Sequence, residues 1–597
     1  FIPQTVAPAY AATGNYCAEG YNMIFFEREG ISDFMFKDPV AHWLPSEEKM
    51  RFYNTRIPMT LLGYTFGGGK ENGQDDFSIT FSGNANKRLQ IGGMLNYLYS
   101  KGMYANQPAK DFTWGLSGSY IGDHFEAQVY GFHYALTVQD NGGITDDLYI
   151  TDPAEVQGGQ TSINPKQIPT RLNGVQNRVN GTELYVNARY KMGFYEEEKI
   201  NDTTVVKHLV PVTSIIYTMK YRNGLRNLRA IASEQNSQFW KNTYYNPTYT
   251  DDSVKYWSLR NTLGVSLLEG FNKYAKAGLS AYVTHEIRDY GSYVEVPEDM
   301  SEELASTLTA LPYPTLTAHG RENLLWVGAQ LTKQKGRIIN YDVTGELGLV
   351  GEATGEIKVN GSLVTRIPLF GDSVTVSAGG KFTNLSAPWL MRHYVSNHYV
   401  WDNDFHKTRT YRLGGEITIP WTWTRLSAGV ENVENALYFN SEGMAAQHSG
   451  NVQVFSATLH QDLHAGCFHW ENRITYQKSS NENIIPLPQL AIYSNMYLTF
   501  RVATLRIQMG IECDYFTRYK PVSYQPATMQ FYNTDGKWIG NYPFMNFYIN
   551  CRLSKTRFFL MMSHVNQGLT GTNYFSMPHY PMNPRRFQLG LSIDFAN

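Results

Sequence analysis

Residues 504–516 read TLRIQMGIECDYF, and apolar and polar side chains alternate along this stretch. Side chains two residues apart share one face of an extended strand, so the stretch predicts a β-strand with one apolar face and one polar face. The apolar set is Leu505, Ile507, Met509, Ile511, Cys513 and Tyr515, and the polar set is Arg506, Gln508, Gly510, Glu512 and Asp514.

The same alternation recurs along the chain, for example in residues 356–367, 468–476 and 546–553. The strands it predicts are commonly ~10–14 residues long, whereas strands of soluble globular proteins usually have about 5–6. A tilted strand needs roughly 9–11 residues to cross a bilayer. No run of about 18 apolar residues exists, so a helical membrane protein is excluded.

Tight turns alternate with long polar loops between these strands. Turns are expected at 86–87, 122–123, 335–336, 371–372, 424–425, 465–466 and 554–555, and long loops near 135–180, 222–252, 290–319, 388–405 and 522–540. Short turns at one end and long loops at the other are typical of bacterial outer-membrane barrels. We therefore predict an all-β transmembrane antiparallel β-barrel of about 22 strands (range 16–22), with short periplasmic turns and long extracellular loops.

The composition excludes several other classes. Of the 597 residues 17% are charged and 14% are aromatic, and the formal net charge is −2. Abundant aromatic residues and a small net charge argue against disorder, and balanced charge argues against a nucleic-acid partner. A soluble β-sandwich array or a β-solenoid is the alternative, but sandwich strands are shorter and no repeat of ~20–50 residues is found.

Residues 1–52 lack the alternating pattern. Pro39 and Pro45 discourage long regular elements there. We expect residues 1–52 to form a plug-like segment in the barrel or at its periplasmic mouth, or a mobile leader, and residues 53–597 to form the barrel. The chain begins with Phe1, which we interpret as a processed or truncated start. Strand pattern begins by about Ile57, which leaves no room for the plug of more than a hundred residues of a TonB-dependent transporter.

Charged residues on the polar face of predicted strands are the candidate lumen lining. They are Glu356, Lys358, Arg366, Glu471, Arg473, Arg506, Glu512, Asp514 and Arg552. Two interpretations stay open: these groups set a transverse field that aligns polar solutes, or they pair with one another or with the N-terminal segment and fill the interior.

The ends of the strands carry two further signals. Trp389, Trp421 and Trp423 lie beside predicted strand ends, where an aromatic belt meets the membrane surface. The last predicted strand alternates almost to the C-terminus, a form that resembles the signal read by the outer-membrane assembly machinery. Its apolar residues are Phe587, Leu589, Leu591, Ile593 and Phe595.

Motifs for catalysis or cofactors are weak. Gly67-Gly68-Gly69-Lys70 lacks the spacing of a phosphate loop, and no helix pattern follows it, so a tight loop is expected. Residues 393–406 gather three His and two Asp, but their spacing matches no standard zinc or calcium site, and we expect solvated loop residues. No GxSxG or HExxH motif is present. We predict no catalytic residues, no metal, no cofactor and no enzyme activity.

Residues 24–150 resemble the start of the outer-membrane porins of the Bacteroidetes described as "putative porin". The resemblance rests on FFEREGISDFMFKDPVAHWLPSEEKMRFYNTRIPMTLLGYTFGGGKEN (25–72), SKGMYANQ (100–107) and DNGGITDD (140–147). It implies a barrel in the outer membrane of a Gram-negative bacterium and no particular substrate.

The leading hypothesis is a porin-like barrel for passive diffusion of small polar solutes. The alternative is a non-transporting barrel subunit of an outer-membrane protein assembly or surface-lipoprotein export complex. The expected partners are outer-membrane lipid, lipopolysaccharide and the barrel-assembly machinery, with which the chain could also form a stable complex.

Overall fold

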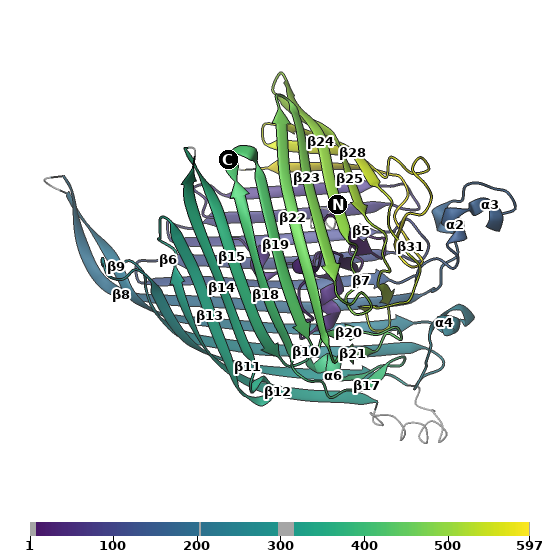
Figure 1. Cartoon of the computed structure of the whole chain (residues 1–597), viewed down its shortest axis with the longest axis horizontal. Coiled ribbons are helices and arrows are strands. Elements are labelled where there is room, and N and C mark those ends of the chain that lie inside the picture. Colours follow the sequence, from purple (N-terminus) through teal and green to yellow (C-terminus); the bar gives the residue numbers. More distant parts are fainter. Residues whose placement is uncertain (1–6, 202–203, 297–315, 370, 596–597) are drawn as a thin grey trace.

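A closed antiparallel β-barrel forms the body of the computed structural model (Figure 1), which describes residues 7–201, 204–296, 316–369 and 371–595. Within these residues 22 strands close the wall, which confirms the predicted fold class and strand number. In order around the barrel they are β3 (Met59–Gly67), β4 (Gln74–Asn84), β5 (Leu89–Ser100), β6 (Ala109–Ile121), β7 (Phe125–Gln139), β8 (Val175–Asn201), β9 (Thr204–Ala230), β10 (Thr250–Leu267), β11 (Gly278–Val294), β12 (Thr317–Lys333), β13 (Ile339–Val350), β14 (Ile357–Leu369), β15 (Asp372–Leu385), β18 (Thr408–Ile419), β19 (Thr424–Glu434), β22 (Asn451–Ala465), β23 (Phe468–Ser479), β24 (Leu490–Val502), β25 (Leu505–Phe516), β28 (Phe544–Leu553), β29 (Thr556–Ser563) and β32 (Arg586–Asp594).

Each wall strand pairs with its two neighbours, and the first pairs with the last. Residues Leu61–Gly67 of β3 pair antiparallel with Gln588–Asp594 of β32, which closes the seam. In a closed sheet every strand has a partner on both sides, so no backbone edge faces lipid. None of the described helices is both long and apolar enough to span a lipid bilayer.

The two faces of the wall differ as the alternation predicts. Large apolar side chains such as Leu363, Leu413 and Ile511 are exposed on the outer face. The residues between them, such as Ser362 and Arg412, point inward. The outer face of such a wall matches the hydrocarbon of the membrane, and the inner face matches a polar lumen.

Strands β8 and β9 are longer than the predicted 10–14 residues. Beyond Tyr190 β8 pairs only with β9, and together they form a two-stranded ribbon that projects past the neighbouring short turns (Figure 1). Two predicted loops are shorter than expected, because strand residues continue to Gln139 in β7 and to Ala230 in β9. The predicted loops 135–180 and 222–252 are in fact 140–174 and 231–249, since polar residues at the strand ends face the lumen and belong to the strands.

Small elements fill the long-loop end of the barrel. They are α2 (Leu148–Thr151), α3 (Pro153–Val156), η4 (Pro165–Gln167), α4 (Glu234–Phe239), η5 (Gly351–Ala353), α6 (Trp389–Arg392), β16 (His393–Val395), β17 (Val400–Asp402), β20 (Leu437–Phe439), β21 (Ala445–Gln447), β26 (Ser523–Gln525), β27 (Gln530–Tyr532), β30 (Phe575–Met577) and β31 (Tyr580–Pro581). A single turn of 3₁₀ helix, η6 (Pro420–Thr422), lies at the short-turn end. Most of the predicted loop 290–319 lies outside the described residues.

The predicted aromatic belt is only partly right. Trp421 and Trp423 are exposed in the short turn between β18 and β19. Trp389 is instead buried in α6, where its ring stacks on Tyr290 at 5.0 Å. It belongs to a loop that folds inward, so it cannot reach the lipid surface.

Candidate functional site: the barrel lumen

The N-terminal segment, defined here as residues 7–50, lies inside the barrel (Figure 1). It contains β1 (Tyr10–Ala12), β2 (Gly20–Asn22), η1 (Phe25–Glu27), η2 (Met35–Val40) and η3 (Glu47–Lys49). Residues 1–6 of the expected plug-like segment lie outside the described residues. We call residues 7–50 the lumen segment.

Ion pairs hold the lumen segment to opposite walls. Lys37 pairs with Glu183 on β8, and Glu27 pairs with Arg473 on β23. Counted from β3, β8 is the sixth strand and β23 the seventeenth of the 22, so they face each other across the barrel. The lumen segment therefore spans the full width of the lumen.

Apolar packing and hydrogen bonds complete this attachment. The Phe34 ring stacks on Tyr256 of β10 at 5.7 Å between centroids. It also lies on Gly224 of β9, where a Cβ would come within 2.6 Å of the ring. The Gln530 amide donates to the Met35 carbonyl at 2.8 Å, and the Tyr16 hydroxyl bonds to Gln588 on β32. The lumen segment is thus in contact with many strands of the wall.

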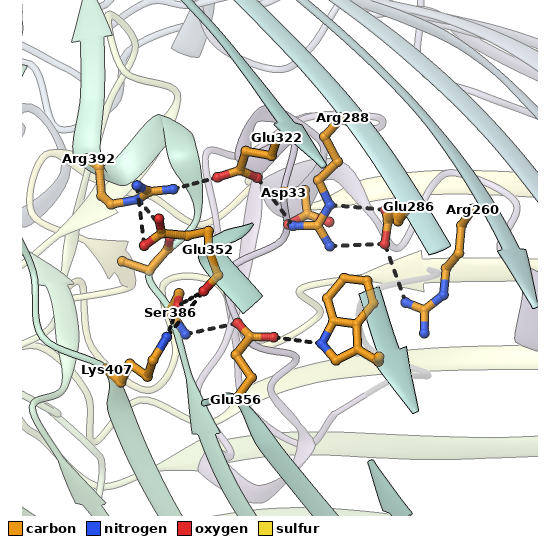
Figure 2. A network of polar contacts seen from close by, with 12 residues as sticks. Asp33, Arg260, Glu286, Arg288, Glu322, Glu352, Glu356, Ser386, Arg392 and Lys407 are labelled. Atoms are coloured by element: carbon orange, nitrogen blue, oxygen red, sulfur yellow. Dashed lines mark hydrogen bonds and ion pairs between the residues drawn. The ribbon is translucent and has the colours of Figure 1, made fainter. Parts of the chain in front are cut away.

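A chain of charges joins the lumen segment, the wall and an inward-folded loop (Figure 2). Arg288 of β11 lies 2.8 Å from Asp33 of the lumen segment, 3.0 Å from Glu286 and 3.8 Å from Glu322. Glu322 also pairs with Arg392 of α6 at 2.5 Å. The Arg288 side chain is 16% exposed and that of Glu286 only 3%, so this network is mostly shielded from water.

Arg226 of β9 is fully buried and has a different role. Its guanidinium donates to the carbonyls of Pro526 and Ala527 at 2.9 Å and to Asn177 Oδ1 at 2.9 Å. It also lies 5.0 Å from the centre of the Phe36 ring. One side chain thus ties the wall, the 517–543 loop and the lumen segment together.

The long loops close the extracellular end. Buried aromatic side chains from four loops pack in one apolar core with the lumen segment. They include Tyr245, Tyr394, Trp401, Tyr524 and Tyr580. The lumen at the long-loop end is therefore filled, while exposed charged residues remain on the lumen face toward the short turns.

Glu356, Lys358 and Arg366 come from one part of the wall. Glu356 precedes β14 and accepts hydrogen bonds from Trp326 Nε1 at 3.0 Å and the Ser386 amide at 3.1 Å. Lys358 lies 5.4 Å from the Trp326 ring centre. Arg366 is exposed on the same face of β14, toward the short turn.

The other predicted residues lie on β23, β25 and β28. Glu512 accepts from Tyr493 at 3.3 Å and from Asn546 at 3.0 Å, and the half-buried Asp514 lies beside it with its carboxylate oxygens shielded from water. Glu471, Arg506 and Arg552 are exposed, and Arg506 is opposite Arg552 in the strand register. The nine residues therefore do not form one site: Glu356 and Lys358 meet around Trp326, Arg473 holds the lumen segment, and Arg506 and Arg552 face each other.

Sequence reasoning missed Arg226, Arg288 and Asp33. Arg226 falls in a stretch predicted as loop, and Asp33 falls in the patternless N-terminal segment. The position of Arg288 along β11 was a usable signal, because Glu286 and Arg288 alternate with the apolar Ile287 and therefore share the lumen-facing side of the strand.

The His-rich loop makes structural contacts. His393 Nδ1 lies 2.7 Å from Asp402, and His398 is buried between Asn242 and Thr250. Burial lowers the pKa of His398 to about 4. Among the described residues no three His, Cys, Asp or Glu side chains are placed to hold a metal ion. Gly67 ends β3, and residues 68–70 begin the β3–β4 connection, where the Gly69 amide donates to Asn72 Oδ1.

The C-terminal strand completes the wall. Phe587, Leu591 and Phe595 are exposed on its outer face, as neighbours of Leu589 and Ile593 in the alternating pattern. The Phe595 amide donates to the Thr60 carbonyl at 2.8 Å, which extends the seam past the end of β32.

These features define an outer-membrane β-barrel with an occupied lumen. A family model described as "Putative porin" matches residues 7–597, and the chain belongs to this family. A comparison with curated proteins gives no match.

Several solved structures share the fold. The siderophore receptor PirA from Acinetobacter baumannii matches with a TM-score of 0.60 and 9% identity, over 91% of this chain and 81% of that one. PirA from Pseudomonas aeruginosa matches with a TM-score of 0.54 and 8% identity, over 91% and 81%. The closed form of the ferric-catecholate import receptor Fiu from K12 E. coli matches with a TM-score of 0.56 and 12% identity, over 91% and 82%. At these identities the likeness shows the fold, and the protein is an outer-membrane barrel.

Proposed function

We propose that this chain is a non-enzymatic transport barrel that carries small polar solutes across the outer membrane and is closed at rest by its lumen segment. The observation that carries the proposal is the pair of attachments Lys37–Glu183 and Glu27–Arg473 on opposite walls. We narrow the leading hypothesis from the sequence, passive diffusion of small polar solutes, to diffusion that requires the lumen segment to move.

The width of the barrel supports this proposal. A wall of 16–18 strands already leaves an aqueous channel, and 22-stranded barrels of outer-membrane transporters have a plugged lumen. Here residues 7–50 and the inward-folded loops occupy that space. The covalent link from residue 50 to β3 keeps the lumen segment at the barrel, so its displacement is reversible.

Planar-bilayer recording tests the proposal. The full chain is expected to conduct rarely, and a variant lacking residues 7–50 is expected to give stable, large conductance steps. The folded state of both is checked by the change in gel mobility on heating. The inward-folded loops pack on residues 7–50, so the deletion also removes the core that holds these loops in the lumen. A folded deletion variant that stays silent at all voltages would therefore contradict transport.

The second candidate is a structural subunit of an outer-membrane assembly or export complex. The exposed aromatic residues Tyr249 and Trp538 of the extracellular loops favour it, because aromatic residues are enriched where proteins meet. Gentle native purification with mass spectrometry distinguishes the two: a stoichiometric assembly-machine partner, together with a silent deletion variant, supports the subunit.

We further propose that lipid and lipopolysaccharide contact the apolar outer face and that the assembly machinery reads the C-terminal strand. The exposed Leu363, Leu413 and Ile511 support the first part. The exposed apolar residues of β32 at the seam support the second.

A further inference from the structure

Four arginines form a row on the lumen wall toward the periplasmic end. Arg501 of β24 is opposite Arg506 of β25, Arg506 is opposite Arg552 of β28, and Arg552 is opposite Arg557 of β29. All four are exposed. Their apolar neighbours Val502, Leu553 and Phe558 are exposed on the outer face, so the arginines face the lumen.

The row differs from the other lumen arginines in its partners. Arg288, Arg412 and Arg473 each form an ion pair with a carboxylate. Within the described part of the chain, none of the four arginines in the row does. Arg552 donates to the Ser554 carbonyl at 3.3 Å, a neutral acceptor. The row therefore keeps its four charges unneutralised by protein.

This arrangement costs stability in the unliganded barrel. Like charges directly opposite on neighbouring strands repel each other. Arginine side chains in a water-filled lumen are screened, which reduces the repulsion and leaves the planar donors free. A row of this kind gains free energy when anions bind between the guanidinium groups.

A cavity of about 690 Å³ lies against the row. Arg506, Arg552 and Arg557 line it together with the amides of Gln508 and Asn550. Most of the lining residues, including Ser78 and Thr499 on the flanking strands, face the lumen, so the cavity lies on the lumen side of the wall. Asp76 is the one carboxylate among its described lining residues, and no residue of the lumen segment takes part. The volume is within the range of small-molecule sites.

We propose that the arginine row binds soluble anions that carry two or more phosphate or carboxylate groups. Neighbouring strands lie about 4.8 Å apart, so four arginines span roughly 14 Å. A compact anion with several charged groups can bridge successive guanidinium groups, each of which forms bidentate hydrogen bonds with phosphate or carboxylate. A solute with one charge engages only one or two of them and binds more weakly.

This inference rests on the proposed function, since it names the class of solute that the barrel carries. Binding at equilibrium needs no conduction, however. If the chain binds anions but never conducts, the anion site stands and the transport proposal fails. If the chain conducts but does not bind anions, only the anion site fails.

Isothermal titration of the full chain in neutral detergent at low salt tests the row, with inorganic tripolyphosphate as the probe and acetate as the monovalent comparison. The native chain is expected to bind tripolyphosphate at least tenfold more tightly than acetate. Arg506→Gln/Arg552→Gln is expected to weaken tripolyphosphate binding about 100-fold, roughly tenfold per arginine. Arg506→Lys/Arg552→Lys keeps the charge but lacks the planar donors, so its affinity for tripolyphosphate is expected to lie between those of the native chain and Arg506→Gln/Arg552→Gln.

Arg366→Gln is the matched control, because Arg366 is also an exposed lumen arginine toward the short turns but lies on β14. It is expected to change the affinity by less than twofold. An equal loss in this control, or native affinity in Arg506→Gln/Arg552→Gln, overturns the proposal, as does a native chain that fails to bind the probe. The gel shift on heating confirms folding of each variant, and Arg557→Gln repeats the test at a second position.

Discussion

Arg473 of β23 forms an ion pair with Glu27 of the lumen segment, on the wall opposite the Lys37–Glu183 pair. Both side chains are mostly shielded, with exposed fractions of 19% for Arg473 and 31% for Glu27. This pair is therefore a suitable place to loosen the lumen segment without changing its apolar packing.

Arg473→Glu is expected to release the lumen segment locally, because it sets two carboxylates against each other. Hydrogen–deuterium exchange in residues 22–30 should rise tenfold or more, which corresponds to a loss of at least about 1.4 kcal/mol in local stability. The double variant Glu27→Arg/Arg473→Glu restores the pair and should return exchange near the native rate. Equal exchange rates in the single and the double variant would contradict a role of the Glu27–Arg473 pair in holding the lumen segment.

Arg288→Met is expected to destabilise the barrel by about 3 kcal/mol, because it removes the ion-pair partner of the half-buried Asp33 and leaves the buried Glu286 paired with Arg260 alone. Urea unfolding in detergent, followed by gel mobility, measures the change. Arg229→Met is the control: Arg229 is 69% exposed in its pair with Asp251, and its loss should cost less than about 0.5 kcal/mol. Similar losses in both variants would show that the Arg288 network is not shielded.

Leu363→Arg and Ser362→Arg test the two faces of β14 at adjacent positions. Leu363 is exposed to lipid, and a charge there should cost about 2–4 kcal/mol near the midplane. Ser362 faces the lumen opposite Asp342, where an arginine gains a partner and should be tolerated. Folded yield in lipid vesicles measures the difference, and equal yields speak against a lipid-facing Leu363.

Acidification is expected to loosen the loop of residues 386–407. Burial lowers the pKa of His398 to about 4, below the ordinary value of 6.5, so the folded loop favours the neutral ring. The stability from this group is complete above pH 6.5, is lost as the pH falls from 6.5 to 4, and changes no further below that. Exchange of this loop, corrected for intrinsic rates, should rise up to roughly 10²-fold.

His398→Gln should abolish this response. The loop after β29 serves as an internal control, because burial also lowers the pKa of His564 to about 4 and that loop should keep its response in the variant. A pH response of residues 386–407 that survives in His398→Gln must come from another group.

Phe595→Asp is expected to reduce assembly in cells more than folding in vitro. Phe595 is exposed on the outer face beyond β32, and its backbone amide bonds to Thr60 whatever the side chain is. Cells should show several-fold less barrel in the outer membrane, whereas folding of the purified chain into vesicles should change little. An equal loss in both assays points to the seam itself instead of the assembly machinery.

The wall was predictable because alternation is a local property. Residues such as Leu505 and Arg506 reveal their faces from their immediate neighbours, and turn residues mark the strand ends. The ends toward the loops were less predictable, because polar residues such as Arg226 continue a lumen-facing strand and resemble a loop in sequence.

The contacts in the lumen were not predictable in the same way. Arg473 and Glu27 are hundreds of residues apart, and no local pattern in residues 1–52 specifies which wall each side chain meets. The inward-folded Trp389 is a similar case, because burial of a loop depends on the width of the space that the other strands leave. The arginine row needs the register of four strands, which only the closed sheet supplies.

The seam between β3 and β32 has a consequence for the order of events during biogenesis. These are the first and last wall strands, so the barrel cannot close until β32 has been made. Residues 7–50 come before β3 and end up enclosed, with side chains held on both sides of the interior. We therefore expect residues 7–50 to enter the interior before Leu61–Gly67 pairs with Gln588–Asp594, because a barrel that closes earlier would leave this segment outside.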